Sequence, residues 1–230
     1  MPVAIVTGAS RGLGLALARS LSFEGWDLVV DAREPQALRA AADRLGPARV
    51  RAVAGDVADA DHRADLVAAA AELGGLDLLV NNASVLGPSP QPPLADYPLD
   101  VLAHVYAVNV LAPLALAQLA LPGLRARRGT IVDITSDAAV EPYEGWGGYG
   151  SSKAALEQIG NVLAAEEPLV HVYTFDPGDM RTRMHQEAFP GEDISDRPDP
   201  ETVVPALLRL LHDAPPSGRY RAGELSAVTP

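Results

Sequence analysis

The chain has 230 residues, and 48% of them are hydrophobic, which is enough for one core in a single α/β domain. The formal net charge of −12 disfavours nucleic acids and anionic membranes as partners, because phosphate contacts need clustered Lys and Arg. Cysteine is absent, which excludes disulfides and thiolate metal sites and suits a reducing compartment, so we expect a cytoplasmic protein. We expect no membrane-spanning segment, and we interpret the short apolar run after Met1 as a buried strand rather than a signal peptide.

Short apolar runs alternate with helical patterns along the whole chain. Strand-like runs rich in β-branched residues lie at 3–8, 27–32, 50–57, 76–83, 129–136 and 170–178. Helical spacing lies at 13–25, 35–45, 61–73, 98–125, 151–167 and 201–214, and a short run at 218–225 ends the pattern. Apolar strands that alternate with helices predict a doubly wound parallel sheet of the Rossmann type, with seven strands and helices on both faces.

No linker divides this pattern, so we predict a single Rossmann-type domain over residues 1–230. The longest polar stretch without a period is 188–200, within a substrate-loop region of about 179–200. A loop of that length is either a lid or binding loop, or a disordered excursion, and the sequence does not decide between them.

The stretch "TGASRGLG" (7–14) stands between the first predicted strand and the first predicted helix. Gly8 allows a tight turn, Gly12 lets the backbone approach a pyrophosphate, and Gly14 lets the helix pack on the sheet. The exposed N–H groups at the start of the helix attract a phosphate. The strand–turn–helix context favours a dinucleotide site over a glycine-rich turn that only packs.

The end of the second strand, "VVDAREP", bears on the choice of cofactor. A carboxylate there would accept hydrogen bonds from the adenine ribose and repel a 2′-phosphate, whereas an arginine would bind that phosphate. Asp31 and Arg33 are both candidates, and Arg11 in the glycine loop is a second possible phosphate ligand. The local chemistry therefore leaves NAD and NADP open.

Seven segments together resemble the short-chain dehydrogenases/reductases, in the order and at about the spacings of that family, over nearly the whole chain. They are "TGASRGLG", "GDV" (55–57), "NNAS" (81–84), Asn109 in "YAVNVLAP", Ser136 in "IVDITS", "YGSSK" (149–153) and "PGDMRT" (177–182). A single match would carry little weight, but seven make the resemblance specific.

The resemblance implies a role for each matched segment. Asp56 and Val57 would contact the adenine, Asn82 and Ala83 would line the ribose side, and the segment from Pro177 to Thr182 would hold the nicotinamide end. The implied cofactor residues are Gly8, Ser10, Arg11, Gly12, Leu13, Gly14, Arg33, Asp56, Val57, Asn82, Ala83, Ser84, Tyr149, Lys153, Pro177, Gly178 and Thr182.

The resemblance also implies the cofactor. The position that is acidic in NAD-preferring members falls on Ala32 rather than Asp31, and Arg33 and Arg11 fall where NADPH-preferring members carry basic residues. We therefore predict NADPH, with NADH the less favoured cofactor.

Tyr149 and Lys153 are i and i+4 on one predicted helix, so their side chains share a face. A free phenol has a pKa of about 10, too high for general acid–base work at neutral pH, and a neighbouring ammonium lowers it. Ser136 ends the predicted fifth strand, at the sheet edge where doubly wound folds bind ligands. A surface pair is the alternative for Tyr149 and Lys153 alone.

The resemblance implies a catalytic set of Asn109, Ser136, Tyr149 and Lys153. Ser136 would orient a substrate carbonyl, Lys153 would bond the nicotinamide ribose, and Asn109 would hold a water that relays protons to the lysine. Asn109 could instead be a buried amide bonded to the backbone. The predicted reaction is the reduction of a ketone or aldehyde by hydride transfer with Tyr149 as general acid. The alternatives are an oxidative alcohol dehydrogenase and a non-catalytic dinucleotide sensor.

Two positions depart from the family pattern. Ser84 stands where the family usually has glycine, so its hydroxyl could crowd or bond the nicotinamide ribose. Asp133 stands where asparagine is common, so a charge could replace a neutral amide in the fifth strand.

The substrate is less well defined by the sequence. By position, Val140, Tyr143, Trp146 and Met184 would line its pocket, which favours a small or medium hydrophobic carbonyl compound. Acidic residues in the segment 137–144 could favour a cation or form a solvated loop. The five histidines have no metal-ligand spacing, so we predict no metal. The apolar helices at 98–125 and 151–167 predict a homodimer or homotetramer.

Overall fold

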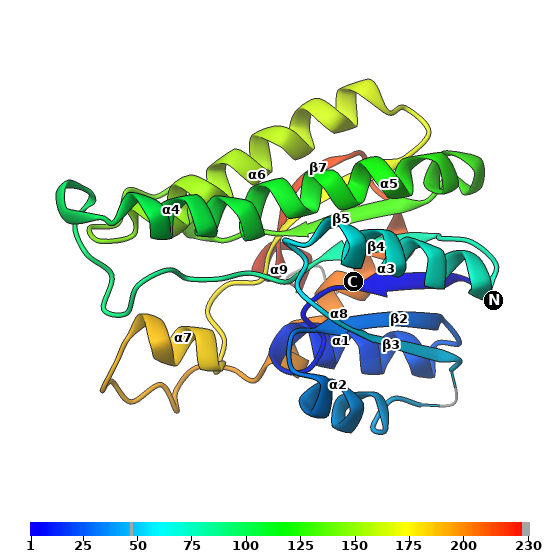
Figure 1. Cartoon of the computed structure of the whole chain (residues 1–230), viewed down its shortest axis with the longest axis horizontal. Helices are drawn as coiled ribbons and strands as arrows, with labels where there is room; N and C mark the ends of the chain where they lie inside the picture. The colour runs from blue at the N-terminus through cyan, green and yellow to red at the C-terminus, as the bar shows by residue number, and fades with distance from the viewer. Residues whose placement is uncertain (47, 227–230) are drawn as a thin grey trace.

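Seven parallel strands form one sheet in the computed structural model, which describes residues 1–46 and 48–226 (Figure 1). In these residues the strand order is β3-β2-β1-β4-β5-β6-β7, so the direction of winding reverses between β1 and β4. The strands are β1 (Val3–Val6), β2 (Asp27–Ala32), β3 (Val50–Ala54), β4 (Leu78–Asn81), β5 (Thr130–Ile134), β6 (His171–Asp176) and β7 (Gly218–Arg221). Every neighbouring pair is parallel, which confirms the predicted doubly wound Rossmann sheet.

The helices are α1 (Gly12–Phe23), α2 (Pro35–Ala42), α3 (Ala60–Leu73), α4 (Leu99–Tyr106), α5 (Ala112–Arg127), α6 (Gly147–Glu166), α7 (Arg183–Ala188), α8 (Val204–Asp213) and α9 (Ala222–Ser226). A π-helical turn, Ala107–Leu111, joins α4 to α5. Short 3₁₀ turns cover Leu94–Asp96 (η1), Asp137–Ala139 (η3) and Pro200–Thr202 (η4).

Strand residues alternate between two cores, as the two-residue period of a pleated sheet requires. Ala4 and Val6 of β1 face one core with α1, α2 and α8, whereas Val3 and Ile5 face the other core with α3, α5 and part of α6. Both strand faces are therefore covered, and this explains why the strands are apolar throughout rather than alternating with polar residues.

One long apolar helical stretch bears on the expectation that the chain has no membrane-spanning segment. Residues Leu99–Arg127 form a continuous helical stretch that is long and apolar enough to cross a membrane by length and composition. In the structure its inner face, with Leu116, Leu121 and Leu124, packs on the sheet as a core helix does. Core helices pass the same test of composition, so the stretch is weak support for a membrane span.

The region predicted as a long loop is partly helical. α7 lies within it, off the layers of the sheet and at the end where the strands terminate (Figure 1). Arg181 N donates to Pro198 O at 2.8 Å, and the Arg181 guanidinium pairs with Asp199, so the two ends of the region are tied together. The segment folds over the carboxyl edge of the sheet instead of forming a disordered excursion.

Candidate active site

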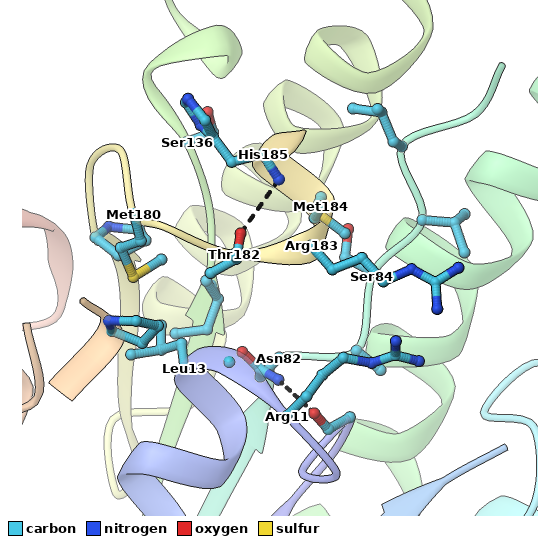
Figure 2. Close-up of a pocket in the computed structure, with 18 of the residues that line it drawn as sticks. Arg11, Leu13, Asn82, Ser84, Ser136, Met180, Thr182, Arg183, Met184 and His185 are labelled. Carbon is cyan, nitrogen blue, oxygen red and sulfur yellow. Dashed lines mark hydrogen bonds between the residues drawn. The ribbon is translucent and has the colours of Figure 1, made fainter. Parts of the chain in front are cut away.

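A cavity of about 1270 Å³ opens at the carboxyl ends of the strands. Its wall comes from the glycine loop (Arg11 and Leu13), from the end of β4 (Asn82 and Ser84) and from the segment after β6, as Figure 2 shows. This is the switch point between β1 and β4, where doubly wound sheets bind ligands. The volume is ample for a dinucleotide and a small substrate together.

Three glycines shape the phosphate end of the cavity. Gly8 and Gly12 have φ angles of +65° and +56°, a conformation that residues with side chains rarely adopt. At Gly14 an added Cβ would lie 2.5 Å from Asn82 Nδ2 and 2.7 Å from Gly8 O, so only glycine fits there. α1 begins without a side-chain cap and with no acidic residue in its first turn, which leaves its N–H groups available to an anion.

Asp31, which the sequence left as a candidate ribose ligand, is turned into the protein. Its side chain is buried, Oδ1 accepts from Gly8 N at 2.6 Å, and Oδ2 lies 3.0 Å from His62 Nε2. Both oxygens therefore hold the glycine loop and α3 in place. The adjacent Arg33 is exposed at the cavity wall. No sequence motif marks His62 as the partner of Asp31.

Four arginines from the glycine loop, α1 and the segments around α2 line the cavity: Arg11, Arg19, Arg33 and Arg44. In the described residues none of the four pairs with a carboxylate, although the chain carries 30 acidic residues and most of its other arginines are paired. A group of unpaired guanidinium groups fits a phosphate ester better than a bare ribose hydroxyl. Sequence reasoning found Arg11 and Arg33 but missed Arg19 and Arg44, which lie outside the motifs.

Tyr149 and Lys153 lie side by side on α6, at the other end of the same cavity. Lys153 Nζ donates to Ile134 O at 2.8 Å and lies 5.5 Å from the centre of the Tyr149 ring. Only 8% of Tyr149 and 2% of Lys153 are exposed, so neither belongs to a surface pair.

Glycines at the start of α6 let it approach its neighbours closely enough to place Tyr149. A Cβ at Gly148 would fall 2.3 Å from the Tyr97 ring, and one at Gly150 would fall 2.5 Å from Ala138 O. The run of small residues around Tyr149 thus has a packing reason that the sequence alone did not reveal.

Burial sets the proton affinities of this pair. Burial lowers the pKa of Lys153 to about 8, while Asp133 and Glu157 oppose that change. Burial raises the pKa of Tyr149 well above its usual range, and the neighbouring Ser84 hydroxyl only partly opposes this rise. The expectation that the pKa of this phenol is lowered is therefore wrong, because loss of solvent dominates.

Ser136 follows β5 and caps η3. Its Oγ accepts from Ala138 N at 3.2 Å and donates to Asp137 Oδ1 at 2.9 Å, while Tyr143 OH donates to Asp137 Oδ2 at 2.9 Å. The hydroxyl lies on the cavity wall with Tyr149. A substrate carbonyl would have to draw the Ser136 proton away from Asp137.

Asn109 lies in the π-helical turn and is fully buried. Its Oδ1 accepts from Ser84 Oγ and Val85 N, and its Nδ2 donates to Val85 O and Ser152 Oγ, all within 2.9–3.1 Å. These four bonds use both the Asn109 side-chain oxygen and its NH₂ group. A water that relays protons to Lys153 would therefore have to be held by the main chain of this turn rather than by the Asn109 side chain. Ser84, the departure from the family pattern, is thus tied to Asn109.

The predicted residues do not all reach the cavity. Gly14 and Asn109 support the wall from behind, and Val140 is 51% exposed and lies outside the lining. The other predicted cofactor and catalytic residues line the cavity, and so do Tyr143, Trp146 and Met184.

An aromatic cluster surrounds Trp146 near Tyr149. The ring centre of Trp146 lies 5.9 Å from that of Tyr149, 5.7 Å from that of Phe189 and 6.5 Å from that of Tyr143. Phe189 directly follows α7, so this short helix brings a further ring to the cluster.

Comparison with known proteins agrees with this geometry. Residues 2–193 match the family described as short chain dehydrogenase. Sepiapterin reductase of Mus musculus is 36% identical over 201 residues, which cover 81% of this chain and 77% of that protein. The chain belongs to the short-chain dehydrogenases/reductases. It is therefore an NAD(P)-dependent oxidoreductase, and the resemblance seen in its motifs is confirmed.

Solved structures of the family superpose closely on this chain. A putative short chain dehydrogenase from Pseudomonas syringae has a TM-score of 0.90 at 31% identity, covering 96% of this chain and 94% of its own. A putative short chain dehydrogenase from Escherichia coli CFT073, complexed with NADPH, has a TM-score of 0.89 at 28% identity, covering 96% of each chain. The dinucleotide fold of this short-chain dehydrogenase is thus shared over nearly its full length.

Proposed function

We propose that this protein is an NADPH-dependent carbonyl reductase. The observation that carries the proposal is a cavity with Ser136, Tyr149 and Lys153 at one end and, at the other, four arginines that pair with no carboxylate of the described residues. Solved relatives with NADP or NADPH bound support the choice of cofactor. The uncapped start of α1 and the glycine loop fit a pyrophosphate between the two ends.

Bound NADPH supplies the hydride to a carbonyl carbon. Ser136 donates a hydrogen bond to the carbonyl oxygen, and Tyr149 transfers its phenolic proton to that oxygen as negative charge develops. Lys153, held by Ile134 O, places a positive charge beside the phenol and stabilises the phenolate that remains. The same residues catalyse alcohol oxidation in the reverse direction.

The rings around Trp146 support an aromatic carbonyl compound as the substrate. Trp146, Phe189 and Tyr143 offer a hydrophobic wall against which a planar ring can pack in the offset or edge-on arrangements that aromatic groups prefer. Met184 adds an adaptable apolar contact to the same cluster.

Turnover is the first test. We expect NADPH oxidation with aromatic ketones or aldehydes, and a loss of at least about 100-fold in kcat for Tyr149→Phe, the contribution typical of a general acid. NADPH binding, followed by fluorescence, is expected to survive the substitution. Binding without turnover across a panel of ketones, aldehydes, diketones and quinones would favour a dinucleotide sensor, and turnover of charged aliphatic carbonyls alone would contradict the aromatic pocket.

Cofactor preference gives a separate prediction. Replacing Arg11 and Arg33 by Ala is expected to lower the NADPH:NADH ratio of kcat/KM by about 10-fold or more, because each charged hydrogen bond contributes about 1.5–3 kcal/mol. Arg39→Ala is the matched control, since Arg39 is an exposed arginine on α2 outside the cavity lining. A ratio that stays unchanged in the double variant refutes the assignment of the phosphate ligands.

We also propose that the protein works in the cytoplasm as a homodimer or homotetramer. The absence of cysteine supports a reducing compartment. Leu119 on α5 and Val162 on α6 are each 45% exposed on the same side of the sheet, and such apolar residues support a shared surface between copies.

A further inference from the structure

Arg219 on β7 joins three parts of the active site from behind. Its Nε lies 2.9 Å from Glu157 Oε1, and its Nη2 lies 2.9 Å from Asp176 Oδ2 and 3.3 Å from Ser136 O. The Arg219 side chain is 23% exposed, while those of Glu157 and Asp176 are 11% and 5% exposed. None of the family segments in the sequence includes this strand, and Arg219 does not line the cavity.

Each partner belongs to a segment that carries reacting groups. Glu157 lies one helical turn after Lys153 on α6 and also accepts from Thr135 Oγ1 at 2.7 Å. Asp176 ends β6, and its Oδ1 accepts from Gly178 N at 3.0 Å in the turn on the cavity wall. The third contact is the main-chain oxygen of Ser136 itself. One guanidinium group thus connects β5, α6 and the turn after β6.

Negative charges face the catalytic pair from four elements. Asp133 of β5 and Glu157 of α6 raise the pKa of Lys153, while Asp137 of η3 and Asp176 of β6 raise that of Tyr149. Arg219 pairs with two of these four carboxylates, Glu157 and Asp176. Arg221 is the other cation on β7; among the described carboxylates it reaches Asp176 alone, at 3.6 Å, and its side chain is 43% exposed.

We propose that Arg219 is a positioning residue for the reaction, holding the Ser136 main chain and the Gly178 turn against α6 while it neutralises Glu157 and Asp176 beside the catalytic pair. The catalytic part of this inference rests on the proposed function. The electrostatic part does not, because it concerns groups that are present with or without a substrate.

The composition of the chain offers a direct probe. Of its 18 basic residues 17 are arginines, so Lys153 is its single lysine and gives one side-chain signal in a protein labelled with [ε-¹³C]lysine. An NMR titration is expected to give a pKa of about 8 for Lys153 in the natural protein. In Arg219→Gln the unneutralised Glu157 is expected to raise it by about 0.5–1 unit. Arg221→Gln, the matched control, is expected to leave it unchanged.

A double variant separates charge from fold. In Arg219→Gln/Glu157→Gln the excess negative charge is gone, so the Lys153 pKa is expected to return to the natural value or below. Equal shifts in Arg219→Gln and Arg221→Gln, or no shift in either, would overturn the electrostatic proposal. If Arg219→Gln does not fold, Arg219→Met with Arg221→Met as its control gives the same comparison, because methionine keeps an unbranched stem, removes the charge and leaves Lys153 as the single lysine.

Kinetics then test the role in the reaction. Arg219→Gln is expected to lower kcat about 10-fold or more. In the plot of kcat for alcohol oxidation against pH, the rise is expected to move to higher pH. Arg219→Lys is expected to restore this pH profile in part. A loss of thermal stability with unchanged kcat and pH profile would mean that Arg219 is only structural. If the natural protein reduces no carbonyl, the proposed function fails, and the NMR comparison still decides the electrostatic part.

Discussion

The carboxyl group of Asp133 lies beneath α6, and a Cβ at Gly160 would stand 3.5 Å from its Oδ2. It is 4% exposed, and its Oδ1 accepts from Asn81 Nδ2 at 2.7 Å. Burial raises the pKa of Asp133 to about 6, although the hydrogen bond from Asn81 and the charge of Lys153 both lower it. The folded protein therefore binds this proton more tightly than the unfolded chain does, and it loses stability as the pH rises from about 4 to 6.

Asp133→Asn is expected to stabilise the protein at high pH. The amide keeps the acceptor for Asn81 but carries no charge, and a raised pKa of about 2 units corresponds to on the order of 3 kcal/mol. The gain is expected to be largest near pH 9, where Lys153 is neutral in both proteins, and to vanish near pH 4, where Asp133 is protonated.

Urea unfolding at the two pH values measures this difference. Asp65→Asn, at an exposed position on α3, is the control and is expected to change stability by no more than about 0.5 kcal/mol at either pH. A variant that is less stable than the natural protein at pH 9 would show that the charge of Asp133 stabilises the fold.

The role of Asp31 could not be predicted from the sequence alone. Its place near the end of β2 suggested a ribose ligand, yet both of its oxygens are bonded inside the protein. His62, which makes one of those bonds, lies 31 positions away, and no short-range pattern in the sequence predicts such a pair. The motif residues Ser136, Tyr149 and Lys153 were found because their spacing reflects a shared helix or strand end.

At the scale of elements, the first turn of α6 decides where Tyr149 lies. Gly150 faces the main-chain oxygen of Ala138, an atom of η3 that cannot move without moving the turn that holds Ser136. Gly147 faces only the side chain of Leu94, which is 65% exposed and free to turn away. Two glycines on one helix therefore differ in what a methyl group would displace.

Gly150→Ala is expected to cost about 1–3 kcal/mol of stability and to lower kcat, since it forces η3 and α6 apart. Gly147→Ala is the matched control, with a change in stability within about 1 kcal/mol and little change in kcat. Thermal unfolding and kcat/KM measured on both variants check the prediction. Equal kcat/KM values for the two variants would mean that the contact between Gly150 and η3 does not position Tyr149.

Most of the elements could be predicted, and the exceptions have physical reasons. The buried strands β1, β2, β4, β5 and β6 are short apolar runs, which is the pattern that single-sequence reasoning reads best. α7 has six residues, fewer than two turns, so its period is too short to stand out. The π-helical turn interrupts an apolar helix without any glycine or proline in its "AVNVL" sequence to signal it.

At the scale of the whole molecule, the exposed apolar residues are distributed unevenly. Leu119 and Val162 lie on the helices that cover one face of the sheet, whereas Phe23, 65% exposed, lies on α1 at the other face. If copies associate through α5 and α6, charges at the first two positions disrupt the assembly, and a charge at Phe23 does not.

Leu119→Asp/Val162→Asp is expected to be a monomer at micromolar concentration, while the natural protein and Phe23→Asp have at least twice the monomer mass. Two carboxylates buried in an apolar contact would lose their hydration without a partner. Light scattering checks the masses. A natural protein that is monomeric at that concentration contradicts the proposed assembly.

The near absence of lysine affects how the protein surface reacts with aldehydes. Aldehydes condense with amines to form imines, whereas a guanidinium group stays protonated and does not take part in that reaction at neutral pH. The one side-chain amine of the chain is 2% exposed, inside the active site, and the exposed cations are arginines. A protein built this way offers a reactive monoaldehyde almost no external side-chain amine for covalent attachment. We therefore expect it to keep its activity at aldehyde concentrations that would cross-link a lysine-rich protein.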